Sequence, residues 1–441
     1  MLDRRSSLFK STQLRLITTQ LLLLEPIWLL VLAPTILLPD RFTSVAWHPW
    51  LIGMLFLFWP LRFLANGYFL PPTPINWTLW LILLWLPVNI GAAVNKPGAW
   101  EAAGYLLVGI VFFVALINWT PTQQYLYWIV SFFFLITLAI ALLGPLVIVP
   151  DATTPFVLLR VQTILHPLVT RLGETVNPNI LAGALVLAVP LQIAFVLSSS
   201  WTQQRWVMIG MTLLGFVTLV VLWLMQSRGA IVASIVALAV VLLWRWPKLT
   251  YLAPLIFVVV GAGRYWMGST RFMELITSNN STGGLNARLE IWTRAYYALH
   301  DFIFTGIGLG NFKIVIPVLY PYIVIPADIE IPHAHNLLLQ IGVDLGLPGL
   351  IAYLGLLINV FVMLLTVLSQ RTKLLSETLA VGVLGSLVAM LVHGMVDATT
   401  WGTKVAFIPW LLFALVTLLY LSEKPDAKRK ASHPIDSLYH Q

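Results

Sequence analysis

Long, uninterrupted apolar runs recur along the whole chain and are separated by short polar segments. A run of about 20 residues is long enough to cross the hydrocarbon core of a bilayer as an α-helix. The runs lack the strict alternation that the strands of a membrane barrel need, and helices satisfy their own backbone in lipid. The pattern therefore predicts an all-α, polytopic integral membrane protein. About twelve spans can be drawn, at residues 16–38, 48–65, 75–94, 100–118, 124–149, 179–198, 206–225, 229–246, 248–267, 336–368, 376–397 and 403–421.

The basic residues between the spans predict an orientation, because short cytoplasmic loops carry an excess of Lys and Arg. Starting from a cytoplasmic N-terminus, the short outer connections hold few basic residues: Arg41, Lys96, Lys404 and Arg228 at a helix end. An even number of spans returns the basic tail to the cytoplasm as well, so both termini are predicted to lie there. The inner side then receives Arg4, Arg5, Lys10, Arg15, Arg62, Arg205, Arg245, Lys248, Arg371, Lys373, Lys424, Lys428, Arg429 and Lys430.

Composition supports the membrane class and excludes several others. Only 10% of the residues are charged, against about 25% in soluble domains. The net charge of +8 comes from loops and tails, which argues against nucleic acid as a partner. With no cysteine in the chain, disulfides, thiolate metal ligands and cysteine nucleophiles are excluded. The 19 tryptophans lie mostly near span ends, where an interfacial belt explains them better than sugar stacking.

Two of the predicted outer connections are long, at about residues 150–178 and 268–335. In the second, residues 285–304 have helical spacing and predict an amphipathic helix on or near the membrane surface. A glycine-rich run follows at 306–310, but it neither follows a strand nor opens a Rossmann unit, so we interpret it as a turn that re-aims the chain. The apolar stripe of the helix consists of Leu285, Leu289, Trp292, Tyr296 and Leu299.

Two arginines and two histidines stand out on the predicted outer side. Arg228 lies at the junction of two spans, and Arg288 begins the amphipathic helix. His333 and His335 directly precede the tenth span. Arginine binds phosphate oxygens through paired hydrogen bonds and stays charged, and imidazole exchanges a proton near neutral pH. A snorkelling cation, a solvated charge and a structural histidine are the ordinary alternatives. Jointly, two guanidinium groups and an imidazole are placed on the outer side, and the arginine pair predicts a site for a diphosphate at the membrane surface.

The positions of three further polar residues in the sequence predict their structural roles. His393 and Asp397 are one helical turn apart, which predicts a structural pair on one face of the eleventh span. Asn336 follows His335 and is expected to fix its tautomer or to cap the next helix. The two histidines are not accompanied by a Glu-x-x-His or His-x3-His pattern, so we expect no metal.

One motif carries a resemblance to a known family. His335-Asn336 is followed by nine residues and then by Gly346-Leu347-Pro348-Gly349. This spacing resembles that of the O-antigen ligase and polymerase family of bacterial membrane glycosyltransferases. Further similarities are Asn177-Pro178-Asn179, Ser227-Arg228-Gly229, and Arg288-x3-Trp292 leading to the run from Gly306 to Phe312.

The resemblance covers roughly residues 170–400 and is incomplete in one respect. The family's Arg-x3-Leu pattern is changed here, since Val232 follows Arg228 and Trp292 follows Arg288 at that distance. Both positions stay apolar, so the change bears on the subfamily more than on the arginines. The first five spans match only in hydropathy.

The resemblance implies a GT-C-like membrane glycosyltransferase of the cell envelope. It implies N-terminal helices at 1–150, a catalytic region at 151–421 with the outer loop 268–335, and a cytoplasmic tail at 422–441. The implied reaction is an inverting transfer, independent of metal or cofactor, from undecaprenyl diphosphate to an acceptor hydroxyl at the outer face of the bacterial inner membrane.

The resemblance also implies roles for particular residues. Arg228 and Arg288 would stabilise the diphosphate leaving group, and His335 would act as the base or orient the acceptor. The candidate substrate-binding residues are Asn336, His333, Arg171, Arg160, Lys313, His393, Asp397 and Lys404.

The acceptor and the class of protein leave alternatives open. The acceptor can be the lipid A core in lipopolysaccharide biosynthesis, another glycan repeat in a polymerase, or a Ser/Thr side chain in protein O-glycosylation. A bicarbonate-type transporter is the alternative of another class. Transport predicts internal repeats and a mid-membrane site, whereas no repeat is evident here and the ionisable residues gather on one side.

Overall fold

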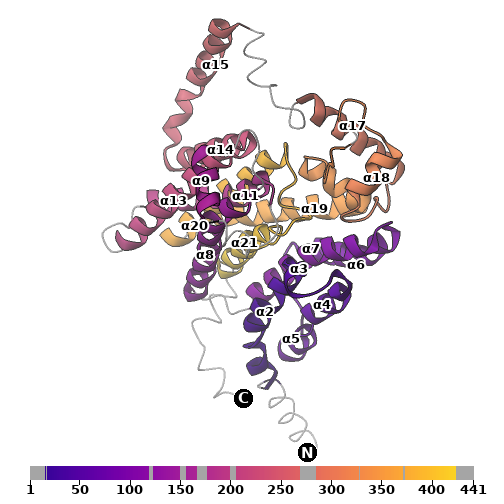
Figure 1. The fold of residues 1–441 in the computed structure, drawn as a ribbon. Coiled ribbons are helices and arrows are strands. Elements are labelled where there is room, and N and C mark those ends of the chain that lie inside the picture. Colours follow the sequence, from indigo (N-terminus) through magenta and orange to yellow (C-terminus); the bar gives the residue numbers. More distant parts are fainter. Residues whose placement is uncertain are drawn as a thin grey trace, which may run out of the picture.

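The structure is a computed structural model, and its described part comprises residue 15 and residues 17–118, 123–148, 155–165, 176–198, 205–268, 285–326, 328–370 and 373–423. Within that part helices dominate (Figure 1), and the extended contact that is present is a single bridge between Ile148 and Val176. The chain is an all-α, polytopic membrane protein, as predicted.

The helices have the following bounds. The N-terminal elements are α2 (Glu25–Leu37), α3 (Pro39–Phe42), η1 (Val45–Trp47), α4 (His48–Leu55), α5 (Trp59–Asn66), α6 (Asn76–Ala92), α7 (Lys96–Asn118) and α8 (Gln123–Val147). The central elements are α9 (Phe156–Ile164), α11 (Pro178–Leu185), α12 (Val189–Leu197), α13 (Arg205–Leu224), α14 (Arg228–Arg245), η2 (Pro247–Leu252) and α15 (Ala253–Met267). The C-terminal elements are α17 (Leu285–Asp301), α18 (Phe312–Leu319), α19 (Leu337–Ser369), α20 (Leu374–Gly394) and α21 (Ile408–Glu423).

The described residues leave the predicted number of spans unconfirmed. In the described part of the chain, nine helical stretches are long and apolar enough to cross a membrane. Asn76–Ala92 and Ile408–Ser422 are apolar but shorter, and the predicted span 248–267 is divided between η2 and the 15-residue α15. The count of twelve is therefore not confirmed. The predicted spans 48–65 and 179–198 are each built from two helices with a proline in the first turn of the second, where proline's missing N–H and fixed φ interrupt a helix.

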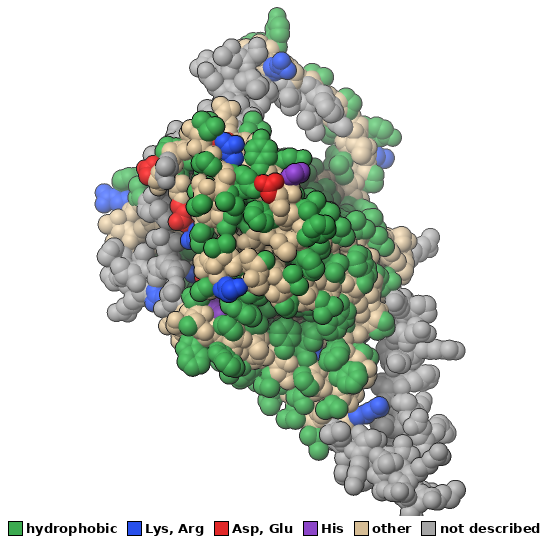
Figure 2. All heavy atoms as spheres, turned by 90° about the vertical axis from the view of Figure 1, so that its right-hand side faces the viewer, with side chains coloured by type: hydrophobic (Ala, Val, Ile, Leu, Met, Phe, Trp, Pro, Cys, Tyr) green, Lys and Arg blue, Asp and Glu red, His purple; other side chains and the backbone are tan. Residues whose placement is uncertain are grey.

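The long helix α19 is central to the packing. It contacts α6, α21, α17 and α20, and α20 in turn packs against α12 and α14. In Figure 1, α17 and α18 lie together beside one end of α19, and α15 extends away from the other helices. Figure 2 looks onto the side that bears α17 and α18, and it shows hydrophobic side chains over most of that face with charged groups scattered among them.

One basic residue used to predict the orientation is not a loop residue. Arg62 of α5 is buried and forms an ion pair with the buried Glu25 of α2. A pair of this kind removes the guanidinium from the membrane surface, because each charge needs the other once both have left water. The predicted orientation therefore rests on the remaining basic residues and stays a prediction.

The inward face of α17 also differs from the predicted stripe. Ala287, Ile291, Ala295 and Ala298 are buried, and they pack in a small core with residues of α18 and the following loop. The stripe residues Leu289 and Tyr296 are 47% and 59% exposed. Small alanines allow the helix to approach its neighbours closely, so they are buried in place of the larger side chains. The placement of α17 on a membrane surface stays a prediction.

Candidate active site

The start of α19 holds the histidine segment in place. Asn336 caps the helix, since its side-chain Oδ1 accepts a hydrogen bond of 3.0 Å from the Leu339 N–H. Its Nδ2 donates to the backbone carbonyl of Met395 at 3.2 Å. The expected capping role of Asn336 is confirmed. The same side chain joins the beginning of α19 to the segment that follows α20.

His335 has an unusual backbone conformation. Its φ of 48° lies in the left-handed region, which non-glycine residues rarely adopt and which costs about 1–3 kcal/mol unless the surroundings enforce it. Three hydrogen bonds do so here. Trp292 Nε1 donates to the His335 carbonyl at 3.3 Å, the His335 N–H donates to His333 Nδ1 at 3.3 Å, and the Ala334 N–H donates to Gln340 Oε1 at 2.6 Å.

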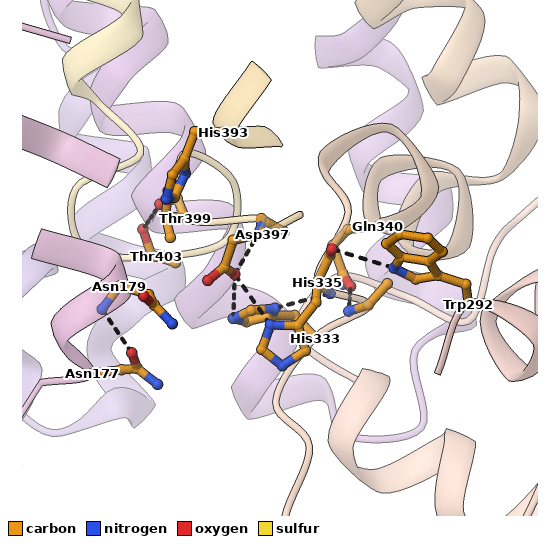
Figure 3. A network of polar contacts seen from close by, with 12 residues as sticks. Asn177, Asn179, Trp292, His333, His335, Gln340, His393, Asp397, Thr399 and Thr403 are labelled. Carbon is orange, nitrogen blue, oxygen red and sulfur yellow. Dashed lines mark hydrogen bonds and ion pairs between the residues drawn. The ribbon is translucent and has the colours of Figure 1, made fainter. Parts of the chain in front are cut away.

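The carboxylate of Asp397 lies against both imidazoles (Figure 3). Its Oδ1 is 3.3 Å from His335 Nδ1 and 3.5 Å from His333 Nε2, and it accepts a hydrogen bond of 2.8 Å from the Ala398 N–H. The contact with His335 has the distance of an ion pair but lacks hydrogen-bond alignment. All three side chains are largely shielded from solvent, with exposed fractions between 4% and 16%.

The surroundings shift the pKa values of Asp397 and His333 so that the two groups differ in charge at neutral pH. Burial raises the pKa of Asp397, but His335 and the other neighbouring imidazoles outweigh it and hold that pKa well below its usual value. Burial lowers the pKa of His333 to about 4, against the attraction of Asp397 and with the help of His335. At neutral pH the carboxylate is therefore ionised and His333 is neutral.

These three side chains could also be read as a metal centre, since their ligand-type atoms lie within 4.8 Å of one another. The hydrogen bonding of His333 does not fit this. Its Nδ1 accepts the His335 N–H, so the neutral ring carries its proton on Nε2, the nitrogen that faces Asp397. A metal ligand needs the lone pair of that nitrogen. The arrangement fits a carboxylate that is in close electrostatic contact with two imidazoles.

The predicted pairing of His393 with Asp397 is not the one observed. Helix α20 ends at Gly394, so Asp397 lies beyond the helix, and its carboxylate is in close contact with the imidazoles of His333 and His335. The ring of His393 instead lies with Nδ1 3.4 Å from Thr399 Oγ1. The chain turns after Gly394, and the turn carries the carboxylate toward the start of α19.

His393 lies between the elements that carry the two candidate arginines. Gly229, which follows Arg228 at the start of α14, is so close to α20 that a Cβ there would stand 2.7 Å from Val396 Cγ2 and 3.5 Å from His393 Cδ2. Arg228 is exposed. Arg288, in the first turn of α17, is partly buried and near enough for its charge to act on the His393 ring. Arg288 of α17 and the start of α14 at Gly229, directly after Arg228, thus both lie near His393.

The glycine-rich run 306–310 forms a tight turn against α19, which confirms the predicted turn. Gly306 (φ +67°) lies against the backbone of residues 343–344, and Gly346 (φ +69°) lies against the backbone of residues 303–304. A Cβ on Gly306 would collide with the carbonyl of Asp344, and one on Gly346 with that of Phe304. The Ile307 N–H donates to the Val343 carbonyl at 2.9 Å, and the Leu347 N–H donates to the Ile303 carbonyl at 2.7 Å. The helix is interrupted at Gly346 to admit the turn.

Polar residues inside apolar runs support this turn, and the sequence analysis did not single them out. Asn89 of α6 donates to the Thr305 carbonyl at 2.9 Å and accepts from the Leu309 N–H at 3.0 Å. Asp344 accepts a hydrogen bond of 2.9 Å from Trp401 Nε1. Their presence within otherwise apolar spans was the available signal, because a polar group at membrane depth needs partners or a function.

Other predicted site residues lie elsewhere or outside the described residues. Lys313 forms an exposed ion pair with Glu330 at 3.2 Å, and no described contact links it to the histidines. Arg160 is exposed, with its guanidinium 5.3 Å from the ring centre of Phe156. Lys404 is partly buried in the segment after Asp397. Arg171 lies outside the described residues.

The chain matches a known family over part of its length. Residues 213–354 match the model of the O-antigen ligase family. The matched residues 213–354 are called the O-antigen ligase region, after the family that they resemble. It contains Arg228, Arg288, His335 and the motif glycines, whereas Asp397 lies beyond it. No curated protein gives a match to the chain. The O-antigen ligase region supports a glycosyltransferase-like activity of the ligase or polymerase type, with a lipid-linked glycan and an acceptor as partners in a membrane.

Proposed function

We propose that this protein transfers a glycan from undecaprenyl diphosphate to an acceptor hydroxyl, with inversion at the sugar carbon and at the outer face of the bacterial inner membrane. The observation that carries the proposal is the contact of Asp397 with His335, at 3.3 Å, within the motif of the O-antigen ligase region. The family supports the reaction type, and the contact supports the assignment of the base.

His335 is proposed to take the proton of the acceptor hydroxyl. An ionised Asp397 beside Nδ1 favours the tautomer that carries its proton on that nitrogen, which leaves the lone pair on Nε2. As Nε2 takes the proton, the acceptor oxygen forms a bond to C1 of the sugar and the bond from C1 to the diphosphate oxygen breaks. The imidazolium that results is stabilised by the carboxylate. Asp397 acts here as a positioning residue.

The arginines are proposed to stabilise the leaving diphosphate. Negative charge grows on the diphosphate as the C1–O bond breaks, and fixed cations are worth several kcal/mol against such charge. Arg288 and the start of α14, which carries Arg228, both approach His393. This supports a common binding place for the two phosphates between α14 and α17. Guanidinium groups suit it because each can hold two phosphate oxygens.

The acceptor stays open among a lipid A core, another glycan repeat and a protein hydroxyl. The O-antigen ligase region is compatible with all three, because they differ only in the group that presents the hydroxyl to His335. Bicarbonate transport is the weaker candidate, since the family match favours glycosyl transfer.

The proposal is tested with the full-length protein in lipid nanodiscs and an undecaprenyl-diphosphate-linked glycan. Arg288→Ala and His335→Ala are expected to abolish transfer, while the lipid-linked donor accumulates in cells. Arg205→Gln removes an exposed cation at the start of α13 and serves as the control with normal transfer. Normal transfer by folded Arg288→Ala or His335→Ala protein would refute the site assignment. If the native protein transfers no glycan to any of the three acceptor classes, the function is wrong.

A further inference from the structure

A recess lies at the ends of three helices, two of which, α14 and α20, also reach the candidate active site. It is bounded by the end of α12, the end of α14 and the start of α20, and it encloses about 70 Å³. Its floor is apolar and includes the buried residues Ala194, Val241 and Val381. Its rim carries polar groups, among them Arg245, Glu377 and Trp244. Nothing in the proposed reaction uses this recess.

The recess and the candidate active site lie at opposite ends of the same helices. Helix α14 has 18 residues, with Arg228 at one end and Arg245 at the other, which corresponds to about 27 Å at 1.5 Å per residue. That length is close to the roughly 30 Å thickness of a hydrocarbon core. Helix α20 runs between them in the opposite direction, from Leu374 at the recess to His393 at the site. The recess therefore lies near the membrane surface opposite to the site.

The residues around the recess are typical of a membrane interface. Helix α14 ends in Trp244-Arg245 and is followed by Trp246, Pro247 and Lys248. Tryptophan is enriched at the headgroup level of membranes, and basic residues gather where phosphates lie. Trp244, Arg245 and Trp246 are exposed in the structure, so their polar groups are available to a lipid that stands beside the helix.

The rim presents one cation and one anion separately. Among the described residues no ion pair joins Arg245 to Glu377. Glu377 instead accepts a long hydrogen bond of 3.5 Å from Trp244 Nε1. Two hydroxyl groups lie nearby, with Thr378 Oγ1 donating to Ser198 Oγ at 3.2 Å. A ligand that fits this rim carries a phosphate for the guanidinium and a cation with N–H groups for the carboxylate.

We propose that the recess binds the headgroup of a phospholipid of the phosphoethanolamine class from that leaflet. The phosphate lies on Arg245, the primary ammonium donates hydrogen bonds to Glu377, and the apolar part of the lipid enters over Val241 and Val381. A phosphoglycerol headgroup offers no cation for Glu377. A choline headgroup has no N–H group to donate. The charge arrangement therefore favours the primary ammonium over both.

The test measures lipid binding directly. Purified full-length protein is titrated with phosphatidylethanolamine, phosphatidylglycerol or phosphatidylcholine, and bound lipids are counted by native mass spectrometry. We expect the first to bind at least fivefold more tightly than the other two. Arg245→Gln is expected to weaken the binding of all three lipids, because each carries the phosphate, and Glu377→Gln is expected to remove the preference for phosphatidylethanolamine. Lys248→Gln is the matched control, because it removes an exposed cation at the same end of α14 without touching the recess.

Three other results would each contradict the proposal. Equal binding of phosphatidylglycerol would show that Glu377 does not select an ammonium. Equal losses in Arg245→Gln and Lys248→Gln would indicate a general attraction of basic surface for phosphate. An unchanged preference in Glu377→Gln would place the ammonium elsewhere. Because glycosyl transfer is not the readout, the outcome is independent of the proposed function.

Discussion

Asp397 Oδ1 lies 3.3 Å from His335 Nδ1, and this contact joins the segment after α20 to the residue that precedes the cap of α19. Two elements far apart in the sequence thereby form one unit. Its carboxylate is fixed by the Ala398 N–H, and its imidazole is fixed by a strained backbone. A base that is held from both sides loses little freedom when it reacts, which is the condition for efficient proton transfer.

Replacing Asp397 with Asn is expected to lower the turnover number roughly 10²- to 10⁴-fold, because an amide neither selects the Nδ1–H tautomer nor stabilises the imidazolium. The Michaelis constant for the lipid donor should change little, since Asp397 is not proposed to contact it. Asp397→Glu should restore part of the turnover. Steady-state kinetics of the three proteins check this. An equal loss in the Asn and Glu variants would indicate a purely structural role.

The buried His333 predicts a particular response of stability to pH. Its pKa is lowered from 6.5 to about 4, so between these values the unfolded chain binds a proton that the folded chain does not. The free energy of unfolding therefore falls as the pH drops from 6.5 to 4, by on the order of 3 kcal/mol. Asp397, whose pKa is lowered, keeps its stabilising contribution above its unfolded pKa and loses it as the pH falls further.

Thermal unfolding of His333→Gln and native protein across this pH range checks the prediction. The native midpoint should fall more steeply with acid than that of the variant. His300→Gln, which alters a histidine with a 74% exposed side chain, should behave like the native protein. Parallel pH curves for the native and His333→Gln proteins would contradict the assignment.

The glycine turn predicts two position-specific losses of stability. Gly306→Ala and Gly346→Ala each place a methyl group against a backbone carbonyl at positive φ, and overpacking and backbone strain each cost about 1–3 kcal/mol. Gly67→Ala also has positive φ, but no atom lies within 4 Å of its Cβ position, so its cost should stay near 1 kcal/mol. Folded yield and unfolding midpoints measure the difference. Equal effects at all three positions would show that strain alone matters.

The ion pair between Glu25 and Arg62 predicts an asymmetry between single and double variants. Arg62→Met leaves a buried carboxylate without a counter-ion and should cost about 3–5 kcal/mol. The double variant Glu25→Leu with Arg62→Met removes both charges and should recover most of that loss, since apolar replacement of a buried pair is often close to neutral. Unfolding midpoints in one detergent compare the three proteins. A double variant less stable than Arg62→Met would contradict this account.

The sequence predicted the fold class because lipid imposes a simple pattern. Apolar runs of sufficient length mark helices whatever their neighbours, and the runs at 100–118 and 336–368 correspond to α7 and α19. Count and boundaries were harder, because they depend on local interruptions. A proline within 179–198 divides that run into α11 and α12, and hydropathy averages over it. The buried face of α17 was missed because its alanines contribute little to an apolar pattern.

The site was predicted in part. The local motif placed His335 and Asn336, and the structure confirmed the cap. The partner of His335 could not be read from spacing, because Asp397 approaches it from another element after a turn that ends α20. The helical spacing of His393 and Asp397 suggested a pair with each other instead. Residues such as Asn89 and Asp344 were visible as polar positions in apolar runs, but their partners depend on tertiary packing.

The interruption of α19 at Gly346 explains why the motif that begins at His335 has a fixed length. The helical segment between them fixes the rotation of the histidine about the helix axis relative to the glycine turn that packs on Gly346. One inserted or deleted residue would turn one end by about 100° relative to the other. Either the imidazole of His335 would then lose its contact with Asp397, or the glycine turn would lose its packing against Gly346. The number of residues in the motif thus sets the angle between the histidine and the glycine turn, so this number matters for the site as much as the histidine itself.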